Sequence, residues 1–398
     1  SGPWTKNLFL DTGSRYRERI VRSSYTWNMG AAHGIEAGVE VAQTIQDSSL
    51  LLGALTPGPG SPEFGGLTSI PQPNSHSTVE ELRYEPFIIH NWQINPRMTL
   101  ESSLIVEYSE IEQAGDVNKV RDFDFLKPKL DYRFNASNTL QFRATLEQRV
   151  SQLSFGDFSR STNPRDDDQD TVAGNPDLEP EEFLRAEVGV DYRLANDAGT
   201  INARYFYEDY ANKIGKIDIS PAPTNLLSTN GNAGSAAAYG LVVNGSLRLG
   251  FLGIPRALLT GGLTIQESEF HDDPFAPIEH GFVPYDRGSF QIGFRHDLPP
   301  QRLNYGFNYN KRFDGGRLMF DIDNRSTFPI PYRMMAWVEK TGFMNLTYRL
   351  EANNMFEQES CIKRYRYQGY VRDGVLREIE NICTTTGLLV NFRVRATF

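Results

Sequence analysis

Apolar and polar residues alternate along most of this chain. In residues 183–194, "FLRAEVGVDYRL", every even position from Leu184 to Leu194 is apolar, and the odd positions between them carry Arg, Glu, Gly and Asp. The same period of two recurs in residues 139–147, 200–208, 303–310, 346–353 and 390–398. Because successive side chains of a strand point to opposite sides of a sheet, each segment predicts a β-strand with one apolar and one polar face.

The lengths of the segments and of their connections distinguish two all-β architectures. A soluble sandwich also alternates, but its strands centre on about 5–6 residues. Many segments here run for about 9–15 residues, and about 9–11 tilted residues cross a bilayer. Short connections (95–97, 135–138, 196–199, 253–256, 298–302) also alternate with long ones (51–80, 153–182, 215–238, 269–286, 357–386). We therefore expect a transmembrane, antiparallel, up-and-down β-barrel.

The alternating pattern predicts about fifteen strands in this chain. They are 14–30, 34–50, 81–94, 98–112, 121–134, 139–152, 183–194, 200–214, 239–252, 257–268, 287–297, 303–324, 332–340, 344–356 and 387–398. Bacterial single-chain barrels normally have an even number of strands. Either residues 4–10 form a sixteenth strand, or the barrel continues in sequence outside these 398 residues.

Composition narrows the function classes without changing this fold. The chain has a net charge of -10 and no cluster of Lys and Arg, so we expect no nucleic-acid partner. It has no run of about 18 apolar residues, which excludes a transmembrane helix. A mean hydropathy of -0.45 does not exclude a barrel, because alternation averages out in a hydropathy window. Ser1 is no natural start, so a missing signal peptide says nothing about compartment.

Several stretches resemble TonB-dependent outer-membrane receptors. Residues 33–41 and 87–108 resemble their middle barrel strands, and residues 123–150 resemble their "FSPR-G-Y" hairpin. "LLVNFRVRATF" (388–398) resembles their final strand. "GNPDLEPEEFLRAEVGVDYRL" (174–194) and "LEANNMFE" (350–357) are similar to two family signatures. The signature residues are Asn175, Pro176, Leu178, Pro180, Glu181, Asn353, Asn354 and Phe356.

This resemblance implies an energy-coupled importer in the bacterial outer membrane. Its loops and plug bind a siderophore, cobalamin, glycan or peptide, and TonB–ExbB–ExbD pulls on the plug. The family barrel has 22 strands and an N-terminal plug, and neither a plug nor a TonB box is found here. Residues 1–398 would then be the C-terminal two-thirds of the barrel, with the plug upstream or in a separate chain. Glu179 stands where the family usually has lysine, and Met355 where it has leucine.

The predicted polar faces suggest candidate site residues. If the chain is a barrel, charged residues opposite the apolar face point into the lumen, where they hold the plug and border a solute path, or simply form a hydrated wall. They include Arg185, Glu187, Arg193, Arg204, Arg349, Arg393 and Arg395. Aromatic residues of the long loops are either ligand contacts or loop-packing residues. They are Phe155, Phe158, Phe270, Phe275, Tyr365, Tyr367 and Tyr370.

The two cysteines, Cys361 and Cys383, lie between the last two predicted strands. In an oxidising compartment they predict a disulfide, and closing a loop of about 22 residues would stabilise by about 3 kcal/mol. The alternative is two reduced thiols in a cytosolic protein, which the barrel argument disfavours. With a periplasmic C-terminus, this loop would be extracellular.

The sequence gives little support for catalysis, a cofactor or a metal. Asp166, Asp168 and Asp170 have the first spacings of a calcium loop, but Thr171 stands where glycine is needed and Asp177 where glutamate belongs. HExxH and GxSxG do not occur. We therefore expect no enzyme, although a passive porin of about sixteen strands and a structural or adhesive barrel remain alternatives to the importer.

The chain ends on an aromatic residue, Phe398. The alternation places Phe392, Val394, Ala396 and Phe398 toward lipid, with Phe398 in the periplasmic aromatic girdle of a barrel. The family resemblance further implies that this residue belongs to the signal that the barrel-assembly machinery recognises.

Overall fold

The computed structural model describes residues 5–71, 75–158, 161–162, 171–172, 174–271, 281–282, 287–313, 317–328 and 332–396. Within them, fifteen strands form one antiparallel sheet. Their order in the sheet is their order along the chain, so each strand pairs with the one before it and the one after it. They are β1 (Leu8–Met29), β2 (His33–Ala54), β4 (His76–Asn95), β5 (Met98–Gly115), β6 (Lys119–Asn135), β7 (Leu140–Val150), β10 (Glu182–Arg193), β11 (Gly199–Asp218), β12 (Ser228–Arg248), β13 (Ala257–Phe270), β14 (Gly288–Leu298), β15 (Leu303–Phe313), β18 (Arg333–Thr341), β19 (Thr347–Asn353) and β22 (Leu389–Arg395).

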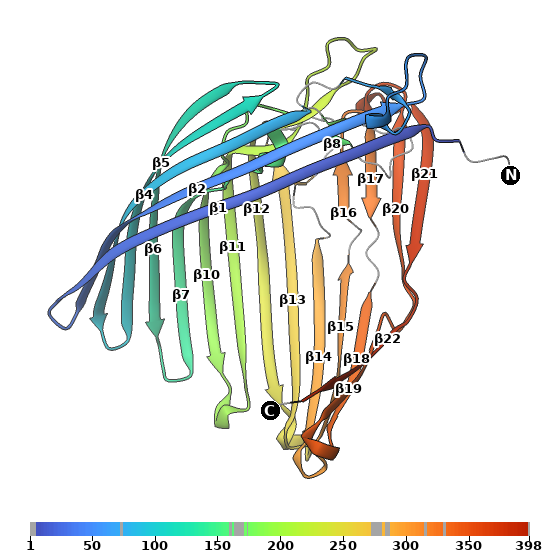
Figure 1. The fold of residues 1–398 in the computed structure, drawn as a ribbon. Helices are drawn as coiled ribbons and strands as arrows, with labels where there is room; N and C mark the ends of the chain where they lie inside the picture. The colour runs from blue at the N-terminus through green and yellow to red at the C-terminus, as the bar shows by residue number, and fades with distance from the viewer. Residues whose placement is uncertain are drawn as a thin grey trace.

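The all-β, antiparallel fold and the fifteen predicted strands are confirmed. Figure 1 shows short turns at one end of the sheet and most of the long connections at the other. Four of the short turns contain the 3-10 elements η3 (Ala195–Asp197), η4 (Leu249–Leu252), η5 (Pro299–Gln301) and η6 (Phe343–Asn345). The described part of the chain holds no helix long and apolar enough to span a membrane.

The sheet has two chemically distinct faces. Val188 of β10 lies opposite Tyr205 of β11 and Ala144 of β7, whereas Arg185 lies opposite Glu208 and Glu147. In-register pairing keeps like side chains on the same side across the strands. We call the side that holds Val188 the apolar face and the side that holds Arg185 the polar face. Large apolar residues on the apolar face are exposed, and Val188 is 56% exposed.

The sheet curls but does not close (Figure 1). Its two edges are β1, which is 22 residues long, and β22, which is seven. All neighbouring pairs are antiparallel, so the first and fifteenth strands run in the same direction. Leu8–Leu10 belong to β1, so residues 4–10 do not supply a separate sixteenth strand, which corrects that alternative.

Two boundary predictions are wrong. Residues 303–324 do not form one strand, because β15 ends at Phe313 and residues 317–320 pair in a second sheet. The predicted loop 215–238 is largely strand, because β11 continues to Asp218 and β12 begins at Ser228. Residues 228–238 are mostly Ser, Asn, Gly and Ala, so they show no alternation that could predict a strand.

The connections on either side of β18 and β19 build a second sheet. Its order is β16 (Arg317–Phe320), β17 (Asn324–Phe328), β20 (Glu359–Tyr367) and β21 (Leu376–Thr385). Figure 1 shows it beyond the upper ends of β15 and β18. The predicted loop 357–386 is therefore a paired hairpin. Smaller pairs are β3 (Thr68–Ser69) with β2, and β8 (Ser161–Thr162) with β9 (Thr171–Val172).

Candidate functional site

The charges predicted to face the lumen lie on the polar face, and Arg185, Glu187 and Arg349 among them form ion pairs. Arg185 binds Glu187 at 2.8 Å and also binds Glu208 on the neighbouring strand. Arg349 of β19 binds Glu351 at 2.9 Å and Glu339 of β18 at 3.6 Å. Register places the other members on the same face, which are Arg193, Arg204, Arg393 and Arg395. The polar face on these strands thus carries cross-strand ion pairs together with further arginines.

A second charge network on β4–β6 was not predicted. Arg83 lies 3.3 Å from Glu85, and Lys127 binds both Glu85 and Glu107, the latter at 2.5 Å. Glu81 accepts a hydrogen bond from the Ser109 hydroxyl at 2.8 Å. In residues 77–81, "STVEE", Val79 is the only apolar residue, so alternation gives no signal there.

The "GNPDLEPE" signature anchors the connection between β7 and β10 to the upper ends of β11 and β12. The Asn175 backbone N–H donates to the carbonyl of Asp157, and its side-chain amide donates to the carbonyl of Asn230, both at 2.9 Å. Asn232 exchanges two hydrogen bonds of 2.9 Å with the backbone of Glu179. The backbone N–H groups of Asn175, Asp177 and Glu179 are therefore each satisfied by a carbonyl or an asparagine side chain.

Leu178 of the signature is the centre of a loop core. It is fully buried against Val79 and Ile111 of the polar face and against Phe155 and Phe158 of the same connection. Phe158 is 2% exposed. Phe155 and Phe158 are thus buried in this core, and their rings contact each other edge-on.

Asp157 lies between these two aromatic residues, in the 3-10 turn η2 (Phe155–Phe158). Burial raises the pKa of its carboxyl, while the Asn230 amide, which donates to it at 2.7 Å, acts in the opposite direction. The loop core is therefore tied to β12 by a polar contact as well as by packing.

Glu181 of the signature completes the hydrogen bonding of an irregularity in β11. The β11–β12 register shifts between Tyr210 and Lys213 and again between Lys213 and Ile214. Glu181 accepts the Ile214 backbone N–H at 2.8 Å and binds the Lys213 ammonium at 2.8 Å. It is 8% exposed. A carboxylate at this position thus satisfies a displaced backbone donor and a cation that is itself only slightly exposed.

The other predicted loop aromatics occupy varied surroundings. Phe270 belongs to a cluster with Phe183, Tyr210 and Phe282, and the Lys213 ammonium lies 4.6 Å from the Tyr210 ring centre. Tyr365 lies under Arg325 at 4.7 Å, and Tyr370 under Arg372 at 4.2 Å. Tyr367 is partly buried in β20. Phe275, like Phe398 and the acidic run of Asp166, Asp168 and Asp170, lies outside the described residues.

The "LEANNMFE" signature covers the end of β19 and contacts the residues that precede β22. Asn354 has a left-handed backbone (φ 53°), and its amide donates to the carbonyl of Gly387 at 2.9 Å. The Asn353 amide donates to Glu351 at 3.0 Å, and Phe356 packs edge-on against Tyr332. Asparagine tolerates this backbone conformation better than most residues do, so Asn354 fixes the point where the chain leaves and re-enters the main sheet.

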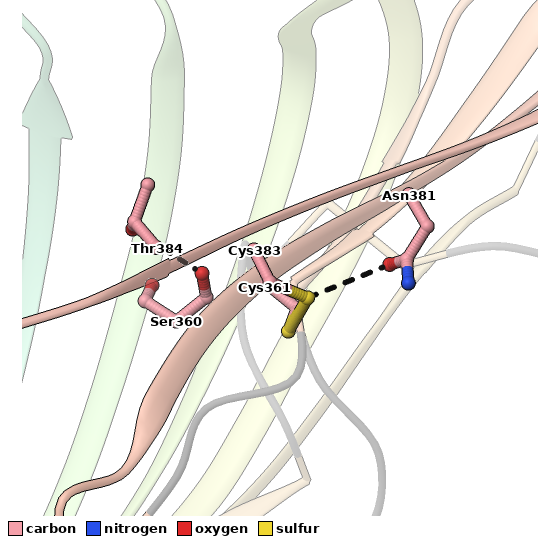
Figure 2. The surroundings of a disulfide bond; sticks show 5 residues. All are labelled: Ser360, Cys361, Asn381, Cys383 and Thr384. Atoms are coloured by element: carbon pink, nitrogen blue, oxygen red, sulfur yellow. Dashed lines mark hydrogen bonds between the residues drawn. A yellow bond between two sulfur atoms is a disulfide. The ribbon is translucent and has the colours of Figure 1, made fainter.

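The predicted disulfide between Cys361 and Cys383 is confirmed. The two residues are direct partners in the β20–β21 ladder, with Cα atoms 4.1 Å apart. Figure 2 shows the bond between its neighbours, where the Thr384 hydroxyl donates to the Ser360 carbonyl at 3.4 Å. Further along the hairpin, Glu380 is buried with Arg364 at 2.5 Å and Arg366 at 2.9 Å. The second sheet therefore has a covalent bond and a buried charge cluster of its own.

Comparison with known proteins agrees with this architecture. A family model described as TonB dependent receptor-like, beta-barrel, matches residues 4–370. No curated protein matches the chain.

Solved structures of similar fold include a copper transporter, OprC, with a TM-score of 0.68 and 12% identity over 97% of this chain and 57% of that one. The ferric yersiniabactin uptake receptor FyuA from Yersinia pestis has a TM-score of 0.65 and 12% identity over 98% of this chain and 55% of that one. The siderophore receptor PiuA from Acinetobacter baumannii has a TM-score of 0.63 and 14% identity over 97% of this chain and 56% of that one. At such identities the likeness concerns the fold alone, and the chain spans a little over half the length of each of these structures.

Proposed function

Because the chain belongs to the TonB-dependent receptor β-barrel family, we propose that it is part of an outer-membrane receptor that imports an extracellular nutrient with energy delivered by TonB–ExbB–ExbD. The observation that carries this proposal is the family match over residues 4–370 together with a sheet that is apolar on one face and ion-paired on the other. A siderophore, cobalamin, a glycan or a peptide would each suit this class of importer.

In this proposal the apolar face contacts lipid and the polar face lines the lumen. The paired charges of Arg185 and Arg349 would then border the plug and the solute path, and the connections packed on the polar face would form part of the extracellular mouth. The C-terminus would be periplasmic.

We further propose that additional strands close the barrel and that a plug fills it, both supplied by sequence outside these 398 residues or by a separate chain. Free strand edges in the hydrocarbon region are strongly unfavourable, because their N–H and C=O groups find no partner there. Since β1 and β22 run in the same direction, all-antiparallel closure requires an odd number of added strands. A family barrel of 22 strands minus the fifteen seen here leaves seven, which is odd.

The transport proposal predicts loss of one uptake activity when the gene is deleted. The deletion strain should fail to use one of a panel of single iron, cobalamin or glycan sources, and a tonB deletion should cause the same failure. Accumulation of the labelled nutrient, with and without the restored gene, is the measurement. Uptake that persists without TonB would favour a passive porin instead, and unchanged uptake of every nutrient would favour a structural or adhesive barrel.

The terminal aromatic residue gives a separate prediction about assembly. Phe398→Ser should lower the amount of protein in the outer membrane, because the proposed signal for the barrel-assembly machinery is weakened. The protein that does insert should keep the wild-type melting temperature. Immunoblots of outer-membrane fractions measure the first quantity, and equal amounts of both proteins would contradict the prediction.

A further inference from the structure

A row of polar residues crosses five strands of the polar face. Asn244 of β12 pairs with Gly262 of β13, which pairs with Gln291 of β14, then Asn310 of β15 and finally Arg333 of β18. These five residues line one pocket of about 370 Å³. Because direct cross-strand partners lie about 4.5–5.5 Å apart, the row presents three amides and a guanidinium to the same space.

Gly262 opens the floor of this pocket. A Cβ atom at this position would lie 2.8 Å from Nε2 of Gln291 and 3.0 Å from Oδ1 of Asn244. The amides of Gln291 and Asn244 therefore lie directly over Gly262, and a side chain at this position would have to displace them. The hollow is thus a product of the residue type and the register together.

The charge of the pocket is unlike that of the rest of the molecule. The cations of its polar-face lining are Arg312 and Arg333, whereas Lys311, which pairs with Phe290, belongs to the apolar face. The lining includes no carboxylate from the described residues. The chain as a whole carries a charge of -10, and the polar face of β4–β11 alternates acids with bases. Within the described part of the chain, Arg333 forms no ion pair, whereas Arg295 of the same face binds Asp297 at 2.9 Å.

The pocket also lies where a solute could enter it. β14 begins at Gly288, β15 ends at Phe313 and β18 begins at Arg333, so the row is close to the end of these strands that carries the long connections (Figure 1). In the proposed orientation this is the extracellular side of the lumen.

We propose that this pocket binds an oxyanion, a carboxylate or phosphate group, of the imported solute. Guanidinium groups bind such anions through charge-assisted, often bidentate hydrogen bonds. The amides of Asn244, Gln291 and Asn310 add neutral donors, and a concave wall of one charge sign concentrates anions near it. That the bound anion belongs to the solute rests on the proposed function. An acidic side chain of a plug domain would offer the same carboxylate group to the pocket.

The test uses the complete purified receptor, with its plug, in detergent. Citrate and inorganic phosphate are the anion probes, glucose is the neutral one, and calorimetry measures each affinity. Arg333→Gln should weaken anion binding about tenfold to a hundredfold, as expected for losing a charge-assisted hydrogen bond. Gly262→Val should weaken it as well, because it fills the pocket while leaving every cation in place.

The matched control is Arg295→Gln, which removes the same charge from the same face but outside the pocket. It should leave anion affinity within about twofold of wild type, since Arg295 is already neutralised by Asp297. Equal losses in Arg333→Gln and Arg295→Gln would overturn the proposal in favour of a general charge effect. Absence of binding by the wild type, with a lowered melting temperature for Arg333→Gln, would overturn it in favour of a plug contact.

These measurements separate the pocket from transport itself. Anion binding by purified receptor does not require TonB, so binding that depends on Arg333 together with uptake that ignores TonB would refute the transport proposal and retain the pocket. TonB-dependent uptake with unchanged anion affinity in Arg333→Gln would refute the pocket and retain the transport proposal.

Discussion

Replacing Glu181 with alanine should release the connection between β7 and β10 from the polar face. The change leaves the slightly exposed Lys213 ammonium without its carboxylate and the Ile214 N–H without its acceptor. Breaking a buried ion pair from one side costs about 3–5 kcal/mol, and we expect about 3 kcal/mol here because Lys213 retains some access to water. Limited proteolysis should show cleavage within residues 151–180 at a rate at least tenfold above wild type.

Glu179→Ala is the matched control for this change. Glu179 lies two residues earlier in the same signature and binds Arg121 at 3.1 Å, but its side chain is 58% exposed. An exposed ion pair contributes about 0–1 kcal/mol, so cleavage should hardly change. If both variants are cleaved alike, the role assigned to Glu181 at the register shift is wrong.

The second large effect should follow removal of the disulfide. Cys361→Ser combined with Cys383→Ser should destabilise the β20–β21 hairpin locally by about 3 kcal/mol, because the open chain gains conformational entropy when the hairpin unfolds. Hydrogen exchange of residues 359–385 should accelerate, while exchange in β10 and β11 should stay at wild-type rates.

A reductant provides the control for the double variant. Reducing the wild-type protein should reproduce the faster exchange, and the same reductant should have no effect on the variant. Unchanged exchange in both cases would mean that the buried cluster of Glu380, Arg364 and Arg366 alone holds the hairpin.

The sequence predicts the main sheet well because strands in a two-faced sheet must alternate. All fifteen were found, including β22, the last strand of the sheet, which has only seven residues. The errors lie where that requirement is absent. Residues 228–238 extend β12 with small residues, and Val79 is the only apolar residue in the first six positions of β4. Neither stretch therefore has the period of two on which the prediction depends.

The site was less accessible to prediction, for a different physical reason. Family resemblance picked out Asn175 and Glu181, but their roles depend on Asn230 and on a register shift in β11 that no local pattern indicates. The row from Asn244 to Arg333 depends on the registers of four successive strand pairs. A short sequence pattern indicates which face of the sheet a residue occupies. It does not indicate which residue lies opposite it on the next strand.

The position of the disulfide within one hairpin has a consequence for biogenesis. Both sulfurs belong to the same pair of adjacent strands, so the bond can form before any other part of the chain is in place. In the proposed orientation, an oxidised β20–β21 hairpin would reach the outer membrane as a closed covalent ring. The machinery that inserts β19 and β22 would then have to translocate a doubled, looped segment between them instead of a single extended thread.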